Sequence, residues 1–121
     1  MTQKYKADVS LSLIKLKTTK DIILMTKTHI VAVTFKPKSE HLTAFTEAMQ
    51  SVKNELPSVD GCEGVRVMTR HDDPAVFMLI EDWESADKHE AHINNLVASG
   101  EWAGLEKMLA EQPTSVILAH F

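Results

Sequence analysis

The side chains with the clearest capacity for chemistry lie between residues 81 and 92. Glu81 and Trp83 alternate in a stretch of strand character, and His89 and His92 follow three positions apart in a stretch of helical spacing. An imidazole titrates near neutral pH, so a histidine can accept a proton from a weakly acidic hydroxyl group. A carboxyl group beside it can orient the imidazole or the hydroxyl. We therefore consider proton transfer first, with structural roles for the same residues as the alternative.

A metal site is the other chemistry that two nearby histidines suggest. The segment His89-Glu90-Ala91-His92 differs from the His-Glu-x-x-His zinc motif because its histidines are three positions apart rather than four. No third ligand is evident in the sequence, so we predict no metal site. Cys62, the one cysteine, has no flanking basic residues to lower the pKa of its thiol, and we do not predict a redox role for it.

The elements that must position these residues follow from the spacing of apolar residues. The pattern predicts strands at 29–36, 65–70, 75–83 and 115–121, a turn at 71–74, and helices at 39–56 and 85–99 with a further helical stretch at 102–109. Ser39 and Ser85 are the expected N-caps, and Gly100 interrupts the second helix. The order β-α-β-β-α-β is the ferredoxin-like split arrangement, an α+β fold.

The third predicted strand is apolar on both faces. Phe77, Leu79, Glu81 and Trp83 share one face, and Val76, Met78, Ile80 and Asp82 share the other. The helices of this topology cover one face of the sheet, and the second face is usually solvated. Large apolar side chains left in water would forgo about 1.5–3 kcal/mol each. We therefore predict that a second copy covers this face in a homodimer.

Composition restricts the class of protein. The chain has 121 residues with a net charge of −4, which suits one domain and disfavours a nucleic-acid surface. No apolar run reaches the roughly 20 residues that span a bilayer, and no signal peptide is apparent, so we expect a cytoplasmic protein without a membrane partner. We predict that residues 1–28 are a peripheral N-terminal extension, within which Met25 resembles a natural start. Residues 29–121 are predicted to form the folded domain.

Three motifs in order carry a resemblance to a known family. They are Gly-Cys-Glu-Gly-Val at 61–65, Phe77-x-x-x-Glu81-x-Trp83, and His92 nine residues after the tryptophan. Together they resemble the antibiotic biosynthesis monooxygenase domain, over about the last three quarters of the chain. The resemblance implies a dimeric α/β barrel, formed when two sheets pack face to face. It also implies quinol-monooxygenase chemistry, in which a small electron-rich aromatic is oxidised by molecular oxygen without a cofactor.

The resemblance also assigns roles to residues. His92 matches the family's recurrent histidine and is the expected catalytic base. Glu81, on the same strand face as Trp83, is the second expected catalytic residue, as a buried acid paired with Arg66 or His92; the alternative is a polar group that only lines the cavity. Trp83 matches the family's tryptophan and is an expected substrate-binding residue. From their places in the predicted elements, rather than from the resemblance, we add Phe77, Leu79, Trp102 and Arg66, with an apolar anchor of the last helix as the alternative for Trp102. For Trp83 the alternative is a core residue that packs the second helix on the sheet, and for His92 a structural helix histidine.

Departures from the family's pattern leave other functions open. Haem-degrading relatives use an asparagine in the first strand, which residues 29–36 lack, and some polyketide-oxidising relatives have an asparagine where this chain has Leu79. One alternative is a non-catalytic small-molecule-binding or stress-associated protein, which keeps the dimeric barrel without turnover. A third function is an isomerase of a phosphorylated signal sugar. The isomerase would need basic residues facing the cavity, for which Arg66 and Arg70 are the candidates.

Overall fold

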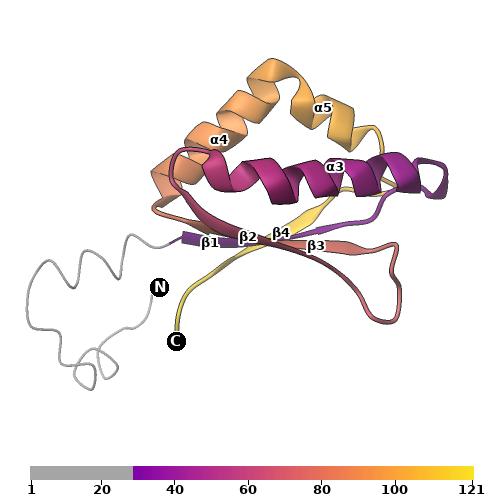
Figure 1. The fold of residues 1–121 in the computed structure, drawn as a ribbon, viewed down its shortest axis with the longest axis horizontal. Helices are drawn as coiled ribbons and strands as arrows, with labels where there is room; N and C mark the ends of the chain where they lie inside the picture. Colours follow the sequence, from indigo (N-terminus) through magenta and orange to yellow (C-terminus); the bar gives the residue numbers. More distant parts are fainter. Residues whose placement is uncertain (1–28) are drawn as a thin grey trace, which may run out of the picture.

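The computed structural model describes residues 29–121, which form one antiparallel sheet covered by helices on one face (Figure 1). The strands are β1 (His29–Phe35), β2 (Cys62–Thr69), β3 (Phe77–Trp83) and β4 (Thr114–Leu118), in the spatial order β2-β3-β1-β4. The helices are α3 (Leu42–Glu55), α4 (Ala86–Ser99) and α5 (Glu101–Glu106), with 3₁₀ turns η1 (Ser39–His41) and η2 (Leu56–Ser58) on either side of α3. The predicted ferredoxin-like α+β fold is confirmed. The N-terminal extension predicted at 1–28 lies outside the described residues.

The register of the sheet assigns each strand residue to a face. In β1, Val31 lies opposite Glu81 and Val33 opposite Leu79, while Ala32 lies opposite Ile80. Residues directly opposite one another in antiparallel strands point to the same side, so the two predicted faces of β3 are confirmed. We call the side that the helices cover the helix face, and the other side the open face. Within the described residues the sheet is not closed, and the barrel stays a prediction.

The core lies between α3 and the helix face. Phe45 and Met49 of α3 are buried against Phe35, Phe77 and Leu79 of the sheet. Phe45 contacts Phe35 and Phe77 with ring centroids 5.5 and 5.2 Å apart, within the range that aromatic pairs favour. A second buried cluster at the other end of α3 contains Val31, Leu56 and Trp83. These two clusters hold α3 flat on the sheet.

Several predicted boundaries differ from the structure: β3 begins at Phe77 rather than at 75, and β4 ends at Leu118 rather than at 121. Two further differences lie at the starts of α3 and β2. Ser39 is not an N-cap: it is the first residue of η1, and neither η1 nor α3 has a side-chain cap. The strand predicted from Val65 begins earlier, at Cys62, because a β-bulge between Cys62 and Gly64 lets this glycine-rich segment pair with β3. Ser85 is the N-cap of α4, as predicted, and accepts a hydrogen bond from the Lys88 N–H at 3.2 Å.

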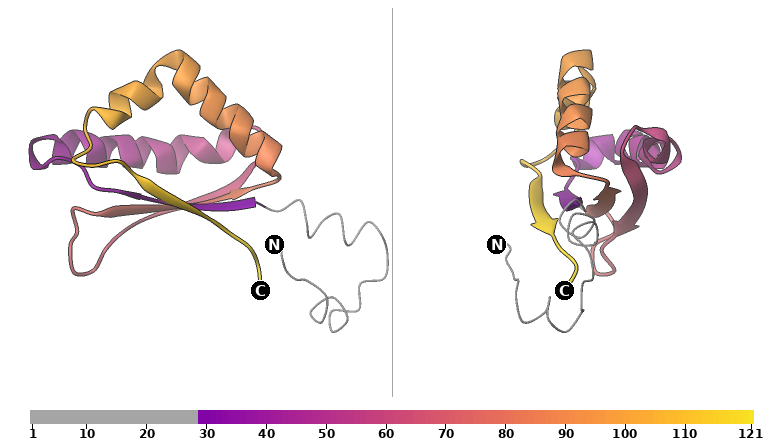
Figure 2. Two further views of the ribbon diagram at one scale, coloured as in Figure 1. Left: turned by 180° about the vertical axis from the view of Figure 1, so that it is seen from behind. Right: turned by 90° about the vertical axis from the view of Figure 1, so that its left-hand side faces the viewer.

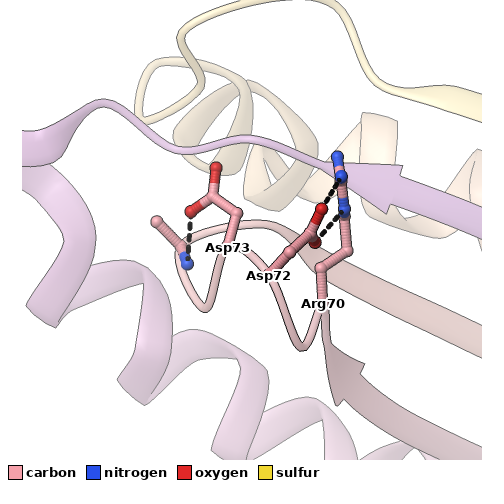
Figure 3. A network of polar contacts seen from close by, with 4 residues as sticks. Arg70, Asp72 and Asp73 are labelled. Atoms are coloured by element: carbon pink, nitrogen blue, oxygen red, sulfur yellow. Dashed lines mark hydrogen bonds and ion pairs between the residues drawn. The ribbon is translucent and has the colours of Figure 1, made fainter.

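The turn between β2 and β3 is stabilised by local polar contacts (Figure 3). The Arg70 guanidinium donates two hydrogen bonds to the Asp72 carboxylate, at 2.9 and 2.6 Å, and the Asp73 carboxylate accepts one from the Ala75 N–H. The hydrogen bonds to Asp72 and its negative charge raise the pKa of Arg70, and the hydrogen bonds from Arg70 lower the pKa of Asp72. Arg70 is therefore engaged at the hairpin tip, and its exposed ion pair contributes little to stability.

Gly61 allows the loop before β2 to contact the first turn of α4. Its φ is +87°, and a Cβ at this position would overlap the side chain of Lys88. The Gly61 carbonyl accepts a hydrogen bond from the Glu84 N–H at 2.8 Å, and Lys88 forms an ion pair with Asp60 at 2.7 Å. The start of α4 is thus fixed beside the end of β3.

We expect Gly61→Ala to destabilise the fold by at least about 2 kcal/mol, because the left-handed backbone alone costs an alanine roughly 1–2 kcal/mol and Lys88 must also move. Urea denaturation measures the loss. Gly104→Ala is the matched control, since a Cβ there meets nothing within 4 Å and alanine favours a helix. Equal stabilities for the two variants would contradict this account of Gly61.

Candidate functional site

A cleft of about 790 Å³ lies on the helix face, between α3 and the pair α4–α5. Its floor includes Val31 and Val33 of β1 and Leu79 and Glu81 of β3. Side chains of α3 form one wall, and His92 of α4 and residues of α5 lie across from it. The cleft is mostly apolar, with a few polar groups, as is typical of small-molecule sites.

The cleft exists because only the start of α4 and the end of α5 are held close to the sheet, while the ends that meet at Gly100 stand away from it (Figure 2). Figure 2 shows the two helices meeting at an angle above the sheet. The bend is at Gly100, which adopts φ 86° and caps α4. α4 starts at the Ser85 cap, and the end of α5 is tied to the chain beyond β1 by backbone bonds from Lys38 to Met108 and from Ala110 to Lys36. Neither helix has a fully buried residue, so the space beneath the bend stays open.

Glu81 is the buried acid of the cleft floor. Its side chain accepts a hydrogen bond from the Trp83 indole N–H, with 2.8 Å between Oε1 and Nε1, and the residue is only 6% exposed. Burial raises the pKa of Glu81, and the bond from Trp83 opposes that rise. The predicted pairing of Glu81 with Arg66 or His92 is not found; its partner is the tryptophan.

His92 and His89 lie over Trp83 on the side of α4 that faces the sheet. The ring centroids of His92 and His89 are 5.1 and 5.6 Å from that of Trp83, and His89 also lies 5.3 Å from His29. Burial lowers the pKa of His92, and the nearby Glu101 opposes this. Burial lowers the pKa of His89 as well, with His29 and His92 adding to the effect. Both shifts favour the neutral imidazole, the form that can accept a proton.

Residues 28–97 match the family model described as antibiotic biosynthesis monooxygenase. The chain belongs to the antibiotic biosynthesis monooxygenase family. A comparison with curated proteins gave no match. The family resemblance carried by the Gly-Cys-Glu-Gly-Val, Phe77-to-Trp83 and His92 motifs is thus confirmed.

Solved structures share the fold of this antibiotic biosynthesis monooxygenase domain. A Nitrosomonas europaea protein that bears the family's name superposes with a TM-score of 0.70 at 20% identity, covering 78% of this chain and 91% of that one. A conserved protein from Methanosarcina mazei gives 0.71 at 17% identity, covering 83% and 99%. Rv0793 from Mycobacterium tuberculosis gives 0.69 at 17%, covering 78% and 95%. At these identities the likeness shows the fold.

The structure brings together four of the site residues predicted from the sequence. Leu79, Glu81, His92 and Trp102 all line the cleft. Trp83 is fully buried beneath His92 and reaches the cleft only through its bond to Glu81. These placements are compatible with the predicted roles, which stay predictions.

Phe77 and Arg66 lie elsewhere in the antibiotic biosynthesis monooxygenase domain. Phe77 is on the helix face but packs in the core against Phe45, away from the cleft. Arg66 lies opposite Ile80 and points to the open face, because β2 alternates and its neighbours Val65 and Val67 take the helix face. Neither residue lines this cleft, and the substrate-binding roles predicted for them stay predictions.

Three titratable lining residues were not among the site residues predicted from the sequence. His89 lies one helical turn before His92, and that spacing was the signal that could have found it. Glu55 ends α3 and Glu101 begins α5, and both line the cleft. Nothing local marks these two glutamates, since only the packing of α3 and α5 brings them to one cavity.

Metal binding and membrane insertion were also assessed. Over residues 29–121, no group of three or more His, Cys, Asp or Glu side chains is arranged to hold a metal ion. Among the helices of this described region, none has the length and apolar character needed to cross a membrane.

Proposed function

We propose that this domain is a cofactor-independent monooxygenase that oxidises a small, electron-rich hydroxylated aromatic with molecular oxygen. The observation that supports it is the position of His92, a neutral imidazole at an apolar cleft whose floor holds Leu79 and Glu81. The cleft is large enough for one or two fused rings. Leu79 and Trp102 contact the ring, and His92 lies within reach of a phenolic hydroxyl.

For the chemistry that we propose, the protein has to supply only two things: a group that accepts a proton, and a cleft that keeps water away from the substrate. His92 accepts the phenolic proton, and the resulting phenolate is a better electron donor to oxygen than the phenol. With a hydroquinone, one oxygen atom replaces a ring hydrogen and the other leaves as water, giving a hydroxyquinone. All four electrons come from the substrate, so no external reductant is required. Glu81 is a positioning residue, since its own hydrogen bond goes to Trp83.

The test is oxygen uptake by metal-free protein with a panel of hydroquinones and anthrones. Uptake above the rate of autoxidation, with one oxygen molecule consumed per substrate and one labelled atom from ¹⁸O₂ in the product, supports the proposal. Binding of these aromatics without uptake would instead identify the domain as a non-catalytic binder. A sugar-phosphate isomerase has less support, because Arg66 points to the open face and Arg70 is paired with Asp72 at the hairpin tip.

We also propose that the domain is a homodimer whose interface is the open face. The centre of this face, Ile30 and Ile80, is already buried, whereas Met68, Val116 and Leu118 toward its two edges are large, apolar and exposed. The prediction from β3 alone thus placed the unprotected apolar surface too centrally. A second copy packed on this face would cover all three residues, and interfaces of about 1,600 Å² are usual for stable pairs.

Val116→Asp is expected to shift the protein from dimer to monomer, since it places a charge in an apolar interface. Sedimentation equilibrium gives the mass of each species. Val97→Asp is the matched control: Val97 is exposed to a similar extent, 59% against 56%, but lies on α4, away from the open face. A native protein that sediments as a monomer at micromolar concentration, or equal effects of the two variants, would contradict the proposed interface.

A further inference from the structure

The cleft is lined by carboxyl groups and histidines, without lysine or arginine among its described residues. Its charged or titratable lining residues are Glu55, Glu81, Glu101, His89 and His92, and none of the described lining residues is Lys or Arg. Glu55 and Glu101 are exposed at the rim, on α3 and α5, whereas Glu81 is buried in the floor. The three acids come from three different elements, so they surround the cleft rather than occupying one side.

Anionic groups find no lysine or arginine partner among the described residues that line this cleft. A bound carboxylate, phosphate or sulfate is normally compensated by Arg, Lys or several N–H donors. Lys53 of α3 and Lys107 after α5 are exposed and do not line the cleft. Lys88 pairs with Asp60 outside the cleft, and Arg66 points to the open face. An anion entering this site would lose hydration and meet carboxylates, which raises its free energy.

From this distribution of charge we infer that the cleft selects uncharged or cationic aromatic ligands and rejects those with a carboxylate, phosphate or sulfate. This inference rests on the proposed function only in taking a hydroquinone ring as the probe. The apolar floor and walls hold the ring. The carboxylates of Glu55 and Glu101 attract a cationic substituent at the mouth of the cleft and repel an anionic one.

The expected difference in affinity between charged and uncharged ligands follows from Coulomb's law. A ligand charge roughly 8 Å from a rim carboxylate, in an effective dielectric of about 40, changes the binding free energy by an amount equivalent to about fivefold in Kd. Two rim carboxylates together should give a discrimination of at least about tenfold. Because both are exposed, the discrimination should shrink as salt is raised.

The experiment is anaerobic calorimetry with three hydroquinones that carry a hydroxymethyl, an aminomethyl or a carboxylate substituent. We expect the aminomethyl compound to bind at least as tightly as the hydroxymethyl compound, and the carboxylate at least about tenfold more weakly. In the double variant Glu55→Gln, Glu101→Gln the three affinities should converge. Glu47→Gln is the control, since Glu47 is exposed on α3 and does not line the cleft.

Three results would overturn the inference. They are equal or tighter binding of the carboxylate by the native protein, a discrimination that survives in the double variant, and failure of all three compounds to bind up to millimolar concentration. Oxygen is excluded, so the outcome is independent of turnover. Charge discrimination without oxygen uptake in the aerobic assay would reject the proposed oxidation and leave this inference standing.

Discussion

His92→Ala is expected to lower kcat by about 10²–10⁴-fold for any hydroquinone that the native domain oxidises. The imidazole lines the cleft and is held neutral, so its removal deletes the proton acceptor. The residue is only partly buried and makes no side-chain hydrogen bond recorded in the described region, so the melting temperature should change little. Stopped-flow oxidation rates and thermal denaturation of the same samples separate the two effects.

Two variants test whether the loss belongs to His92. His71→Ala removes an exposed histidine at the hairpin tip and should leave the rate unchanged. His89→Ala removes the other imidazole of the cleft. If His92→Ala kept full activity and His89→Ala lost most of it, the base would be His89 rather than His92. Full activity in both would reject a histidine base.

The pH profile gives a further check on the same residue. A base must be neutral to act, and burial lowers the pKa of His92. The acid limb of kcat/KM should therefore lie below the ordinary histidine pKa of about 6.5. Glu101 raises the pKa of His92, so Glu101→Gln should displace the limb to still lower pH. An acid limb above the ordinary value would contradict the assignment.

Trp83→Ala is expected to lower the free energy of unfolding by about 3–5 kcal/mol. Trp83 is 0% exposed, packs with Val31 and Leu56, and supplies the hydrogen bond to Glu81. The variant leaves both a cavity and a buried acid without its donor. Urea denaturation measures the loss, with Trp102→Ala as the control because Trp102 is only partly buried beside the cleft. A smaller loss for Trp83 than for Trp102 would contradict this account.

Trp83→Phe isolates the hydrogen bond from most of the packing. Glu81 has a raised pKa in the folded state, so the cost of its buried charge is absent below the unfolded pKa of about 4.3 and complete above the folded value. Without the indole N–H that pKa rises further. The loss of stability should therefore be larger at about pH 8 than at about pH 4. A loss that does not vary with pH would mean that Glu81 stays protonated throughout.

Sequence reasoning succeeded where local patterns decide the structure. Alternation on β3 assigned Phe77 to Trp83 to their faces, and Ser85 and Gly100 marked the ends of α4. Both depend on neighbours within a few positions. Ser39 failed as a cap because the chain makes a 3₁₀ turn before α3, an arrangement that the apolar spacing of the helix does not distinguish from a longer helix.

The site was predicted less completely because it is assembled from distant elements. Arg66 was assigned to the cavity by residue type, whereas the register that places it opposite Ile80 points it to the other face. The partner of Glu81 was sought among charged groups, but the neighbouring strand residue on the same face, Trp83, supplies the donor. Glu55 and Glu101 belong to different helices, and only tertiary packing makes them neighbours of one ligand.

The central position of β1 has a consequence for how the chain is made on the ribosome. β1 pairs on one side with β3, Phe35 with Phe77, and on the other with β4, Ile30 with Leu118. Translation is slow compared with the formation of a hairpin, so β1, β2 and β3 can associate while β4 is still unsynthesised. Until residues 114–118 emerge, one edge of β1 has unpaired backbone groups, which attract other strands. The nascent chain is therefore prone to aggregate in the interval between the pairing of β1 with β3 and the arrival of β4.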